Sequence, residues 1–390
     1  MRATKVDAVI IGAGINGASI GYNLAKRRYN NIAIVERFTI ASGGTGKSAA
    51  IVRQHYSNEV LIRMAKRSRD IFEFFADEVG GSAGFVKTGY LFFVPEYAKD
   101  VFKVNIELQQ KIGIRTSSIS KEESLEISPQ IDPGDTGAIA YEPESGYADP
   151  YEATVSYLQA AKTLGARVYQ SCPVQSIHVQ HGKVQRVITA KAEFSTGVVI
   201  NVSGPWANKV GGMVNISYPI QVTREQEVMF RTESQLDCPR VTVSDMCNAI
   251  YFHPFGRDLL VGRGYPKEYE EADPDNYREG SDPDFVEDTA ERVIKRIPKM
   301  EAAMILKGYS GLYDVTPDWH PIISTHPEVE GFVSVVGFSG HGFKLAPAIG
   351  EAVAELIMEG KSTAADLSLF SADRFANGRV FKAAYGGNRA

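Results

Sequence analysis

Short runs of hydrophobic residues alternate with amphipathic stretches over the first forty residues of the chain. Residues 6–11 form an apolar run that is typical of a strand. From Ile15 to Ala25, hydrophobic residues recur at helical spacing among small residues. A second apolar run, residues 31–36, ends in Glu36. This order predicts a strand, a helix and a second strand.

The same alternation continues through the middle of the chain. Hydrophobic residues at helical spacing predict helices at residues 58–79, 97–112 and 150–164, and a short capped helix that begins near Ser120 and stops at Pro129. Apolar or alternating runs predict strands at residues 89–95 and 198–202, and a hairpin over residues 174–190 that turns at His181-Gly182.

The pattern changes between residue 216 and about residue 312. Strand-like runs at residues 249–255 and 259–265 are followed by an acidic stretch, residues 270–284. We expect this stretch to be an exposed, mobile loop, and it lacks the spacing of an EF-hand calcium site. Further on, residues 333–336 predict a strand, and a helix begins near Lys344 with Pro347 tolerated in its first turn.

Separated segments of the chain are expected to build one domain. The strand at residues 198–202, with a helix signal at Pro205, indicates a return to the first sheet. We therefore predict an α/β domain made of residues 1–85, 145–215 and 320–390. A mixed-sheet α+β domain is inserted between them, made of residues 86–144 and 216–319. Ligands are expected to bind where the two domains meet.

A glycine motif occupies the turn between the first strand and the first helix. Gly12, Gly14 and Gly17 have the spacing G-x-G-x-x-G. The first glycine permits a tight turn, the second lets a pyrophosphate approach the backbone, and the third lets the helix pack closely on the strand. Glu36 follows Gly12 by 24 residues, where a carboxylate can accept hydrogen bonds from an adenosine ribose. These features predict a dinucleotide site.

The loop after Glu36 favours FAD over NAD as the dinucleotide. A purely NAD-binding domain usually continues with more alternating strands and helices. Here residues 37–56 form a loop rich in small residues. Such a loop can lie along a cofactor that extends beyond the pyrophosphate, as FAD does.

Part of that loop, Gly46-Lys47-Ser48, also matches the end of the P-loop of NTPases. The full P-loop motif requires a glycine five residues before Gly46, where this chain has Ala41. In addition, the other glycine loop already occupies the place directly after the first strand. The sequence therefore argues against an NTPase.

Composition excludes several other classes of protein. The chain of 390 residues has a formal net charge of −5, so it lacks the basic character of a nucleic-acid binder. No apolar run near the N-terminus is long enough for a signal peptide or a membrane span. The cysteines Cys172, Cys238 and Cys247 lack the spacing of a disulfide frame or zinc site. We expect a cytoplasmic protein with reduced thiols and no metal.

Two C-terminal segments resemble a known family. They are "GLYDVTPDWHPIIS", residues 311–324, and "GFVSVVGFSGHGFKLAPAIGEAVAELI", residues 331–357. Together with the N-terminal motif, they make nearly the whole chain similar to the FAD-dependent D-amino-acid oxidase, glycine oxidase and sarcosine oxidase superfamily. The most similar members are sarcosine oxidases, their β subunits and related amine dehydrogenases. The resemblance implies a Rossmann-like, glutathione-reductase-type FAD-binding domain with an inserted substrate domain.

The resemblance also implies a reaction, the oxidation of the C–N bond of a small amino acid. A secondary or N-methylated substrate such as sarcosine or proline, or else glycine, would lose a hydride to flavin N5 and become an imine. Similar enzymes hold the substrate carboxylate with cations at the places of Arg53 and Lys344, and have a tyrosine near the substrate at the place of Tyr251. Arginine suits a bidentate grip on a carboxylate, and lysine adds a point charge.

The motifs and the resemblance together predict the residues beside FAD. They are Gly12, Gly14, Ile15, Asn16, Gly17, Glu36, Arg37, Ser42, Gly43, Thr45, Gly46, Lys47, Ser48, Val174, Gly204, Trp206, Gly311, Gly337, Gly340, His341, Gly342, Phe343 and Lys344. Gly337, Gly340 and Gly342 would let backbone approach a flat ring, and the helix that follows would direct its positive end at the flavin.

The chain departs from the family at two positions that bear on mechanism. Gly311 stands where monomeric sarcosine oxidase attaches flavin through a cysteine, so we expect non-covalent FAD. Leu260 stands where that enzyme has a lysine that assists reaction with oxygen, so another electron carrier is an open alternative to oxygen. The resemblance to β subunits also leaves open an assembly with partner subunits or a homo-oligomer. A 2-hydroxy acid or glycerol phosphate dehydrogenase, or an electron-relay subunit, remains an alternative function.

Overall fold

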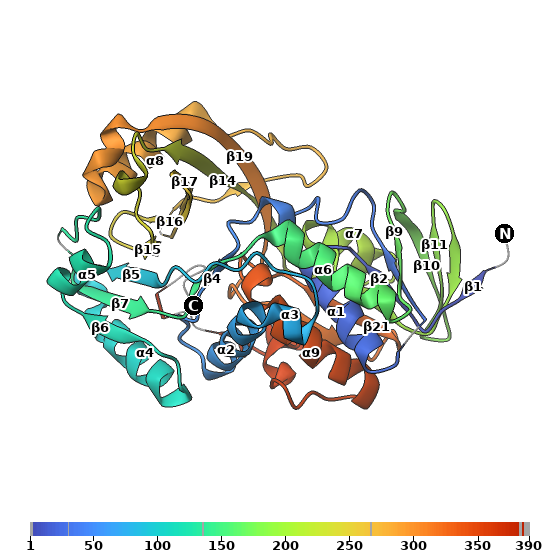
Figure 1. Ribbon diagram of the computed structural model, residues 1–390. Helices are drawn as coiled ribbons and strands as arrows, with labels where there is room; N and C mark the ends of the chain where they lie inside the picture. Colours follow the sequence, from blue (N-terminus) through green and yellow to red (C-terminus); the bar gives the residue numbers. More distant parts are fainter. Residues whose placement is uncertain (1–2, 30, 135, 266, 382–383, 386–390) are drawn as a thin grey trace.

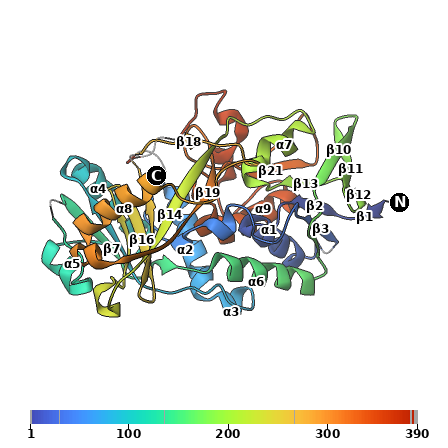
Figure 2. The same ribbon diagram turned by 90° about the horizontal axis from the view of Figure 1, so that it is seen from above.

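The computed structural model describes residues 3–29, 31–134, 136–265, 267–381 and 384–385. Within these residues the chain forms two large sheets, a four-stranded sheet and a two-stranded ribbon. In Figures 1 and 2 the four-stranded sheet lies at one end of the molecule, beside the N-terminus, and helices α4 (Lys99–Ile112) and α5 (Lys121–Ile127) lie at the other end.

The first large sheet has six strands in the order β20-β21-β13-β2-β3-β9. The strands are β2 (Ala8–Ile11), β3 (Ile32–Val35), β9 (Arg167–Tyr169), β13 (Val199–Asn201), β20 (Ile322–Thr325) and β21 (Phe332–Val336). Neighbours pair in parallel except for β20, which is antiparallel to β21. Consecutive residues of β2, β3, β13 and β21 are buried, as their apolar runs predict. The four predicted strands of this region are therefore confirmed.

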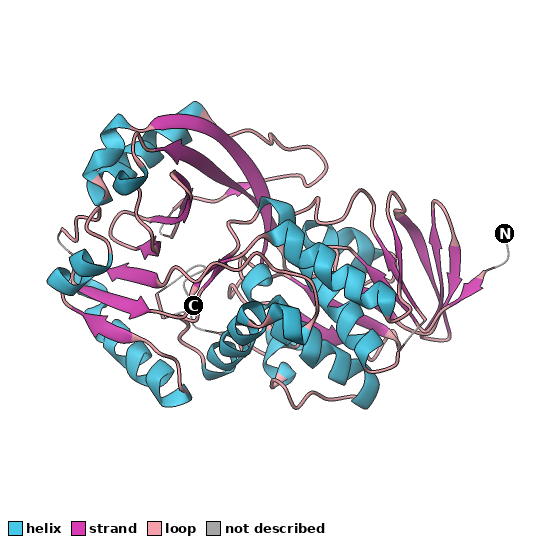
Figure 3. Cartoon of the chain, viewed as in Figure 1, coloured by secondary structure: helices cyan, strands magenta, loops and turns pink. Residues whose placement is uncertain are grey.

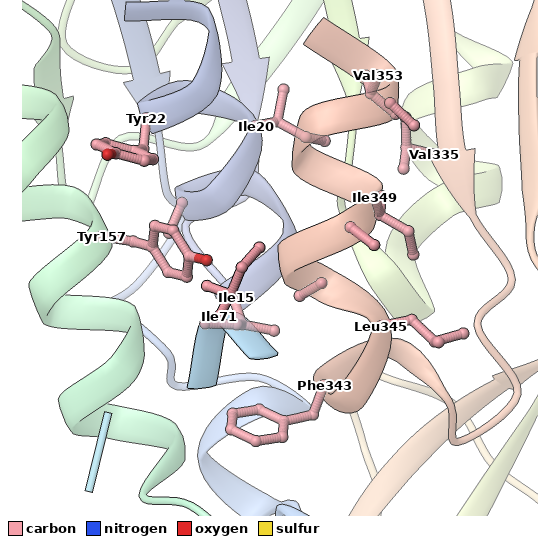
Figure 4. Close-up of a cluster of buried hydrophobic side chains, with 14 of the residues drawn as sticks. Ile15, Ile20, Tyr22, Ile71, Tyr157, Val335, Phe343, Leu345, Ile349 and Val353 are labelled. Atoms are coloured by element: carbon pink, nitrogen blue, oxygen red, sulfur yellow. The ribbon is translucent and has the colours of Figure 1, made fainter. Parts of the chain in front are cut away.

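Three helices pack together beside this sheet and form the main core. Helix α1 (Ile15–Lys26) lies between α6 (Pro150–Thr163) and α9 (Gly342–Glu359), which come from distant parts of the chain. Figure 4 shows Ile15 and Tyr157 beside α1 on the side of α6, and Ile349 on the side of α9 that faces Val335 of β21. All three side chains are buried. Helix α2 (Glu59–Glu73) packs on α9 and adds Phe72, which stacks on Phe343.

The second large sheet has nine strands and is mixed. Its strands are β5 (Tyr90–Val94), β6 (Ser117–Ile119), β7 (Ala138–Glu142), β14 (Gln221–Arg231), β15 (Thr242–Asp245), β16 (Ile250–Phe255), β17 (Asp258–Arg263), β18 (Glu270–Glu271) and β19 (Met304–Val315). The long antiparallel pair of β14 and β19 reaches from this sheet toward the first one, as Figure 3 shows. Helix α8 (Pro283–Arg296) packs on β14, β16 and β17.

The remaining elements connect or extend the two sheets. They include β1 (Thr4–Lys5), β4 (Ile51–Val52), β8 (Gly146–Tyr147), β10 (Val174–Gln180), β11 (Lys183–Thr189), β12 (Glu193–Ser195), α3 (Phe75–Glu78), α7 (Ala207–Gly212) and several short 3-10 helices, two of them at Thr45–Lys47 and Gly204–Trp206. The hairpin of β10 and β11 confirms the predicted turn, because His181 and Gly182 both have positive φ. The capped helix at Ser120 is also confirmed as α5, with a complete capping box.

Three predictions of secondary structure were wrong in detail. The helix expected over residues 58–79 is broken at Phe74, where α2 ends and α3 begins. Helix α9 starts at Gly342, so Pro347 lies in its second turn rather than its first. Helix α8 begins inside the stretch expected to be a loop, because Pro283 is well suited to the first helical position.

The strands of the two large sheets come from alternating segments of the chain. The first sheet uses strands between residues 8 and 35, 167 and 201, and 322 and 336; the second uses strands between residues 90 and 142 and between 221 and 315. The exact domain boundaries stay a prediction. Within the described residues, no helix combines the length and apolar character that a membrane crossing requires.

Candidate active site

The turn after β2 is tightly packed around its glycines. Gly12 has a φ of 117°, and a Cβ atom there would lie 2.4 Å from the carbonyl oxygen of Val202. A Cβ atom at Gly17 would lie 2.0 Å from the carbonyl oxygen of Gly12. Both positions therefore exclude any larger residue, as the dinucleotide motif requires.

The carboxylate of Glu36 ties this turn to the end of β3. One oxygen accepts a hydrogen bond from Ala13 N at 3.0 Å, and the other accepts one from Phe38 N at 2.9 Å. Nearby, the hydroxyl of Thr45 accepts from Ile15 N at 3.1 Å. Each carboxylate oxygen has a second lone pair, so Glu36 can still accept a hydrogen bond from a ligand.

A cavity of about 300 Å³ extends from the end of β3 to the start of α9. Most of the predicted cofactor residues line it: Gly12, Gly14, Ile15, Asn16, Gly17, Glu36, Arg37, Ser42, Gly43, Thr45, Ser48, Val174, Gly204, Trp206, Gly340, Gly342 and Phe343. Gly14 precedes the first turn of α1, whose backbone N–H groups have no partner within the helix. The buried Oδ1 atom of Asn16 also has no hydrogen-bond partner. This lining fits the phosphates and polar edges of a dinucleotide.

Six predicted cofactor residues do not line the cavity, and one of them, Lys344, lines a second, smaller cavity instead. Gly46 and Gly311 lie in tightly packed backbone: a Cβ atom at Gly46 would lie 2.5 Å from Ala41 O, and one at Gly311 would lie 3.0 Å from Lys47 Cβ. Gly337 N donates to Asp314 Oδ2 at 2.7 Å in the turn after β21. His341 is buried, and its Nδ1 atom lies 3.1 Å from the Tyr56 hydroxyl.

The ammonium of Lys47 lies against the acidic stretch rather than the cavity. It donates to the Tyr277 hydroxyl at 2.6 Å and pairs with Glu279 at 3.2 Å. Further along the same stretch, Asp275 accepts from Arg37 at 2.8 Å and from Trp206 Nε1 at 2.7 Å, and it also pairs with Lys209. The stretch, although largely exposed as expected, is thus attached to the mouth of the cavity.

Several residues that line this cavity were not predicted. They include Phe38, Gly44, Cys172, Ser203, Lys209, Met213, Leu312, Tyr313 and Asp314. Tyr313 matters most, because it lies over Gly340; a Cβ atom on Gly340 would come within 2.5 Å of its ring. The sequence signal for Tyr313 was its place in the "GLYDV" segment, residues 311–315. The direction of its side chain depends on the register of β19, which the sequence does not give.

A second cavity of about 80 Å³ opens beside the first. It is lined by all three predicted substrate residues, Arg53, Tyr251 and Lys344. The two cavities share four lining residues, namely Ser48, Tyr313, Gly340 and Phe343. A molecule in the smaller cavity would therefore lie next to the α9 end of the larger one.

Two cationic side chains face the smaller cavity. The Lys344 ammonium donates to Gly340 O at 3.0 Å. Burial, followed by the charge of Arg53, holds the pKa of Lys344 well below its ordinary value. The Arg53 guanidinium lies over the Tyr56 ring at 4.6 Å and donates to His55 O. An anion in this cavity would relieve the repulsion between the two cations.

Buried polar groups back this cavity. Burial and the charge of Arg53 lower the pKa of His55 to about 3, so it is neutral at ordinary pH. Burial raises the pKa of Glu142, whose carboxylate accepts from Gln54 N at 2.9 Å and Ser145 Oγ at 2.6 Å. The Tyr56 hydroxyl lies 3.1 Å from His341 Nδ1. Within the described residues, no cluster of three or more potential ligands could hold a metal ion.

The profile of the family described as "DAO: FAD dependent oxidoreductase" matches residues 7–356. The chain belongs to this family. The family resemblance and the FAD cofactor predicted from the sequence are thereby confirmed, and so is the class of enzyme, an FAD-dependent oxidoreductase. FAD fits the larger cavity, because the glycine turn, the start of α1 and Glu36 provide the contacts that a dinucleotide needs.

Similar proteins support the same family over most of the chain. The mitochondrial sarcosine dehydrogenase of Mus musculus is 28% identical over 376 residues, which are 92% of this chain and 40% of that protein. The chain thus spans less than half of that relative. Glycine oxidase of Geobacillus kaustophilus is 28% identical over 381 residues, 95% of this chain and 97% of that protein.

A solved structure described as L-proline dehydrogenase from P. horikoshii has the same fold. It superposes with a TM-score of 0.90 at 32% identity, over 97% of this chain and 100% of that chain. The predicted α/β fold with an inserted mixed sheet is therefore confirmed at the level of the whole chain.

Proposed function

We propose that this protein oxidises the C–N bond of a small amino acid, with FAD bound non-covalently in the larger cavity and the amino acid in the smaller one. The observation behind the proposal is the pair of cations, Arg53 and Lys344, in a small cavity that adjoins the cofactor cavity. A secondary or N-methylated amino acid, such as sarcosine or proline, or else glycine, is the proposed substrate.

The charges of the smaller cavity favour a carboxylate. Arg53 can form two parallel hydrogen bonds with a carboxylate, and Lys344 adds a third donor beside it. Because Lys344 has a depressed pKa, a bound carboxylate would also favour its charged form. Substrate binding and Lys344 protonation would then reinforce each other.

The size of the cavity favours a small substrate. Its volume of about 80 Å³ is well below the roughly 300–1,000 Å³ of pockets that hold drug-sized ligands. Tyr90, Phe92 and Phe343 line it and would exclude water from the amine and the carbon beside it. Orientation by the two cations and exclusion of water are the contributions that the protein itself makes to the rate.

FAD, when bound, supplies the acceptor for a hydride. The glycine turn, the first residues of α1 and Glu36 would hold its dinucleotide part, and Gly340, Gly342 and Tyr313 would lie at the end nearest the substrate. Gly311 replaces the cysteine used for covalent attachment in a similar enzyme, which supports non-covalent binding.

The names of similar proteins agree with this substrate class. They are described as acting on sarcosine, glycine and L-proline. The smaller cavity is less suited to a glycerol phosphate. Among the described residues that line the smaller cavity, the lysine and arginine side chains are Lys344 and Arg53, and His55 is neutral near pH 7. A dianionic phosphate would need more positive charge.

The test is turnover of the FAD-loaded protein with a reducible dye as electron acceptor. Sarcosine, proline, glycine, lactate and glycerol 3-phosphate are supplied in parallel, and the carbonyl product is identified. Dye reduction by at least one amino acid supports the proposal. Reduction by lactate or glycerol 3-phosphate alone would overturn it, and turnover only with a copurifying partner would indicate a relay subunit. Replacing the dye by air then distinguishes an oxidase from a dehydrogenase.

A further inference from the structure

Four residues form a transverse row across the second large sheet. Tyr251 on β16 is paired with Gly262 on β17, Gly262 is paired with Glu227 on β14, and Glu227 is paired with Tyr309 on β19. Residues paired in this way point to the same face of a sheet. One end of the row, Tyr251, lines the substrate cavity.

Hydrogen bonds link the three side chains of the row, because Gly262 at its second position leaves room for Tyr251 to reach Glu227. The Tyr251 hydroxyl donates to Glu227 Oε1 at 2.9 Å, and the Tyr309 hydroxyl donates to the other carboxylate oxygen. A Cβ atom on Gly262 would lie 2.3 Å from the Tyr251 hydroxyl oxygen. Any side chain at this position would therefore move the Tyr251 ring away from Glu227.

Glu227 is buried among groups from every element around it. Glu225 lies two residues away on β14, Tyr309 and Tyr313 face it from β19, Tyr251 faces it from β16, and Lys267 approaches from the loop after β17. Burial is the main cause that raises the pKa of Glu227 to about 7, while the two tyrosine hydrogen bonds and Lys267 act in the opposite direction. Near neutral pH this carboxyl can therefore both gain and lose a proton.

Amine oxidation creates a need for such a group. A hydride leaves the carbon beside the amine only with help from the nitrogen lone pair, which an ammonium lacks. Arg53, one of the two groups that would hold the substrate carboxylate, cannot accept the ammonium proton, because a guanidinium has no acceptor. The amine must lose a proton, and Tyr251 is the residue of the row that lines the cavity.

We propose that Tyr251 and Glu227 form a relay that removes the ammonium proton of the bound amino acid. The inference rests on the proposed function. The substrate N–H bond breaks as its proton moves to the Tyr251 oxygen, and the original Tyr251 proton moves to Glu227 Oε1. Glu227 ends as a neutral acid, Tyr251 is unchanged, and the substrate amine is neutral and ready for oxidation. Tyr309 and Gly262 position the relay.

The experiment measures the rate of anaerobic flavin reduction by sarcosine against pH, in the FAD-loaded protein and its variants. The relay needs ionised Glu227, so the rate should rise with pH. This rising limb of the pH–rate profile should be centred near pH 7. In Glu227→Gln and Tyr251→Phe the limb should move toward the pKa of the free amine, with a loss of about 100-fold at pH 7. Tyr309→Phe removes a hydrogen bond that lowers the pKa of Glu227, so it should move the limb upward by a smaller amount.

Gly262→Ala is the matched variant, because it disrupts the row without altering any titratable group. It should reproduce the limb of Tyr251→Phe while keeping the flavin bound. A second readout needs no turnover. An infrared band of a protonated carboxyl in the cofactor-free protein should titrate near pH 7 and be missing from Glu227→Gln.

Each outcome decides the question. Retention of the original limb in Glu227→Gln would overturn the relay, and if that variant fails to fold, retention in Tyr251→Phe and Gly262→Ala would overturn it equally. Failure of the unaltered protein to be reduced by any amino acid at any pH would overturn the proposed function itself, and the relay with it. A shifted limb in all three variants would support the relay.

Discussion

The cofactor cavity and the substrate cavity are built in different ways. The cofactor cavity includes the backbone of short glycine-rich turns in its wall, where Gly12 and Gly17 leave no room for a Cβ atom. The substrate cavity is walled by side chains from segments far apart in the chain, with Arg53 next to β4, Tyr251 on β16 and Lys344 on α9. A shared margin at Ser48, Tyr313, Gly340 and Phe343 joins them.

This difference suggests that the two cavities tolerate different kinds of substitution. A wall made of backbone is sensitive to the addition of a single methyl group but indifferent to most charge changes. A wall made of charged side chains is sensitive to charge and shape at a few positions. Substitutions should therefore separate cofactor binding from substrate binding, and the following predictions proceed from the largest expected effect to the smallest.

Gly12→Ala should abolish FAD retention. The φ of 117° strains any L-residue, and the new Cβ atom would lie 2.4 Å from Val202 O, so the turn cannot keep its shape. The measurement is the ratio of flavin to protein absorbance after purification in excess FAD. Gly212→Ala is the control, because Gly212 has open space around it and should retain FAD normally. Normal FAD retention by Gly12→Ala would contradict the account of the turn.

Arg53→Met should weaken carboxylate ligands by roughly 10-fold to 150-fold and leave FAD bound, since a hydrogen bond to a charged group contributes about 1.5–3 kcal/mol. Binding of methoxyacetate, which replaces the sarcosine nitrogen by oxygen, is followed through the flavin spectrum. Lys344→Met should act in the same direction.

Lys47→Met is the control for both of these variants. It removes a cation from the loop of residues 37–56. Because Lys47 pairs with Glu279 outside the substrate cavity, methoxyacetate should bind as before. Unchanged methoxyacetate affinity in Arg53→Met would remove the role assigned to Arg53.

Low pH should destabilise the folded protein in part through His55, which is buried and lines the substrate cavity. The pKa of His55 is about 3 in the folded protein, whereas an unfolded histidine titrates near its ordinary value of 6.5. Its contribution to stability is therefore complete above pH 6.5 and is lost as the pH falls toward 3. His55→Asn should make the decline in Tm between pH 6.5 and 4.5 shallower by a few degrees. The exposed His178, changed to Asn, should leave the slope as it is.

Asp275→Asn should have the smallest effect, a severalfold faster release of FAD. Asp275 attaches the acidic stretch to Arg37, Trp206 and Lys209 at the cavity mouth, but it is partly exposed, and such ion pairs contribute about 0–1 kcal/mol. The release rate is measured by flavin fluorescence at low and high salt, and the difference from the unaltered protein should shrink with salt. Glu271→Gln, an exposed change in the same stretch, should match the unaltered protein. An equal effect of both variants would argue against the attachment.

The two regions also differ in how well the sequence predicted them. Gly12, Gly14, Gly17 and Glu36 were predictable because a local motif dictates their contacts over a strand, a turn and a helix. Lys47, in the later loop of residues 37–56, was assigned to the cofactor by family resemblance, but its side chain contacts Tyr277 and Glu279 of the acidic stretch. Side-chain direction depends on what packs opposite, which a local motif does not contain.

The substrate side shows the same limit more strongly. Arg53, Lys344 and Tyr251 were placed by family resemblance, and the structure brings them to one cavity. Glu227 was missed, since its meeting with Tyr251 depends on the register of β14, β17 and β16. The helix α8 was missed because its acidic start continues the composition of the preceding loop. For Glu227 the missing information was strand register over long sequence separations.

The most direct measurement is the visible spectrum of the FAD-loaded protein, without oxygen, as sarcosine and then proline are added. The account predicts that the flavin band bleaches with at least one of them, and that Arg53→Met needs a much higher concentration for the same change. A protein that stays yellow with sarcosine, proline and glycine would contradict the proposed substrate class. A protein that takes up no FAD would contradict the assignment of the larger cavity as well.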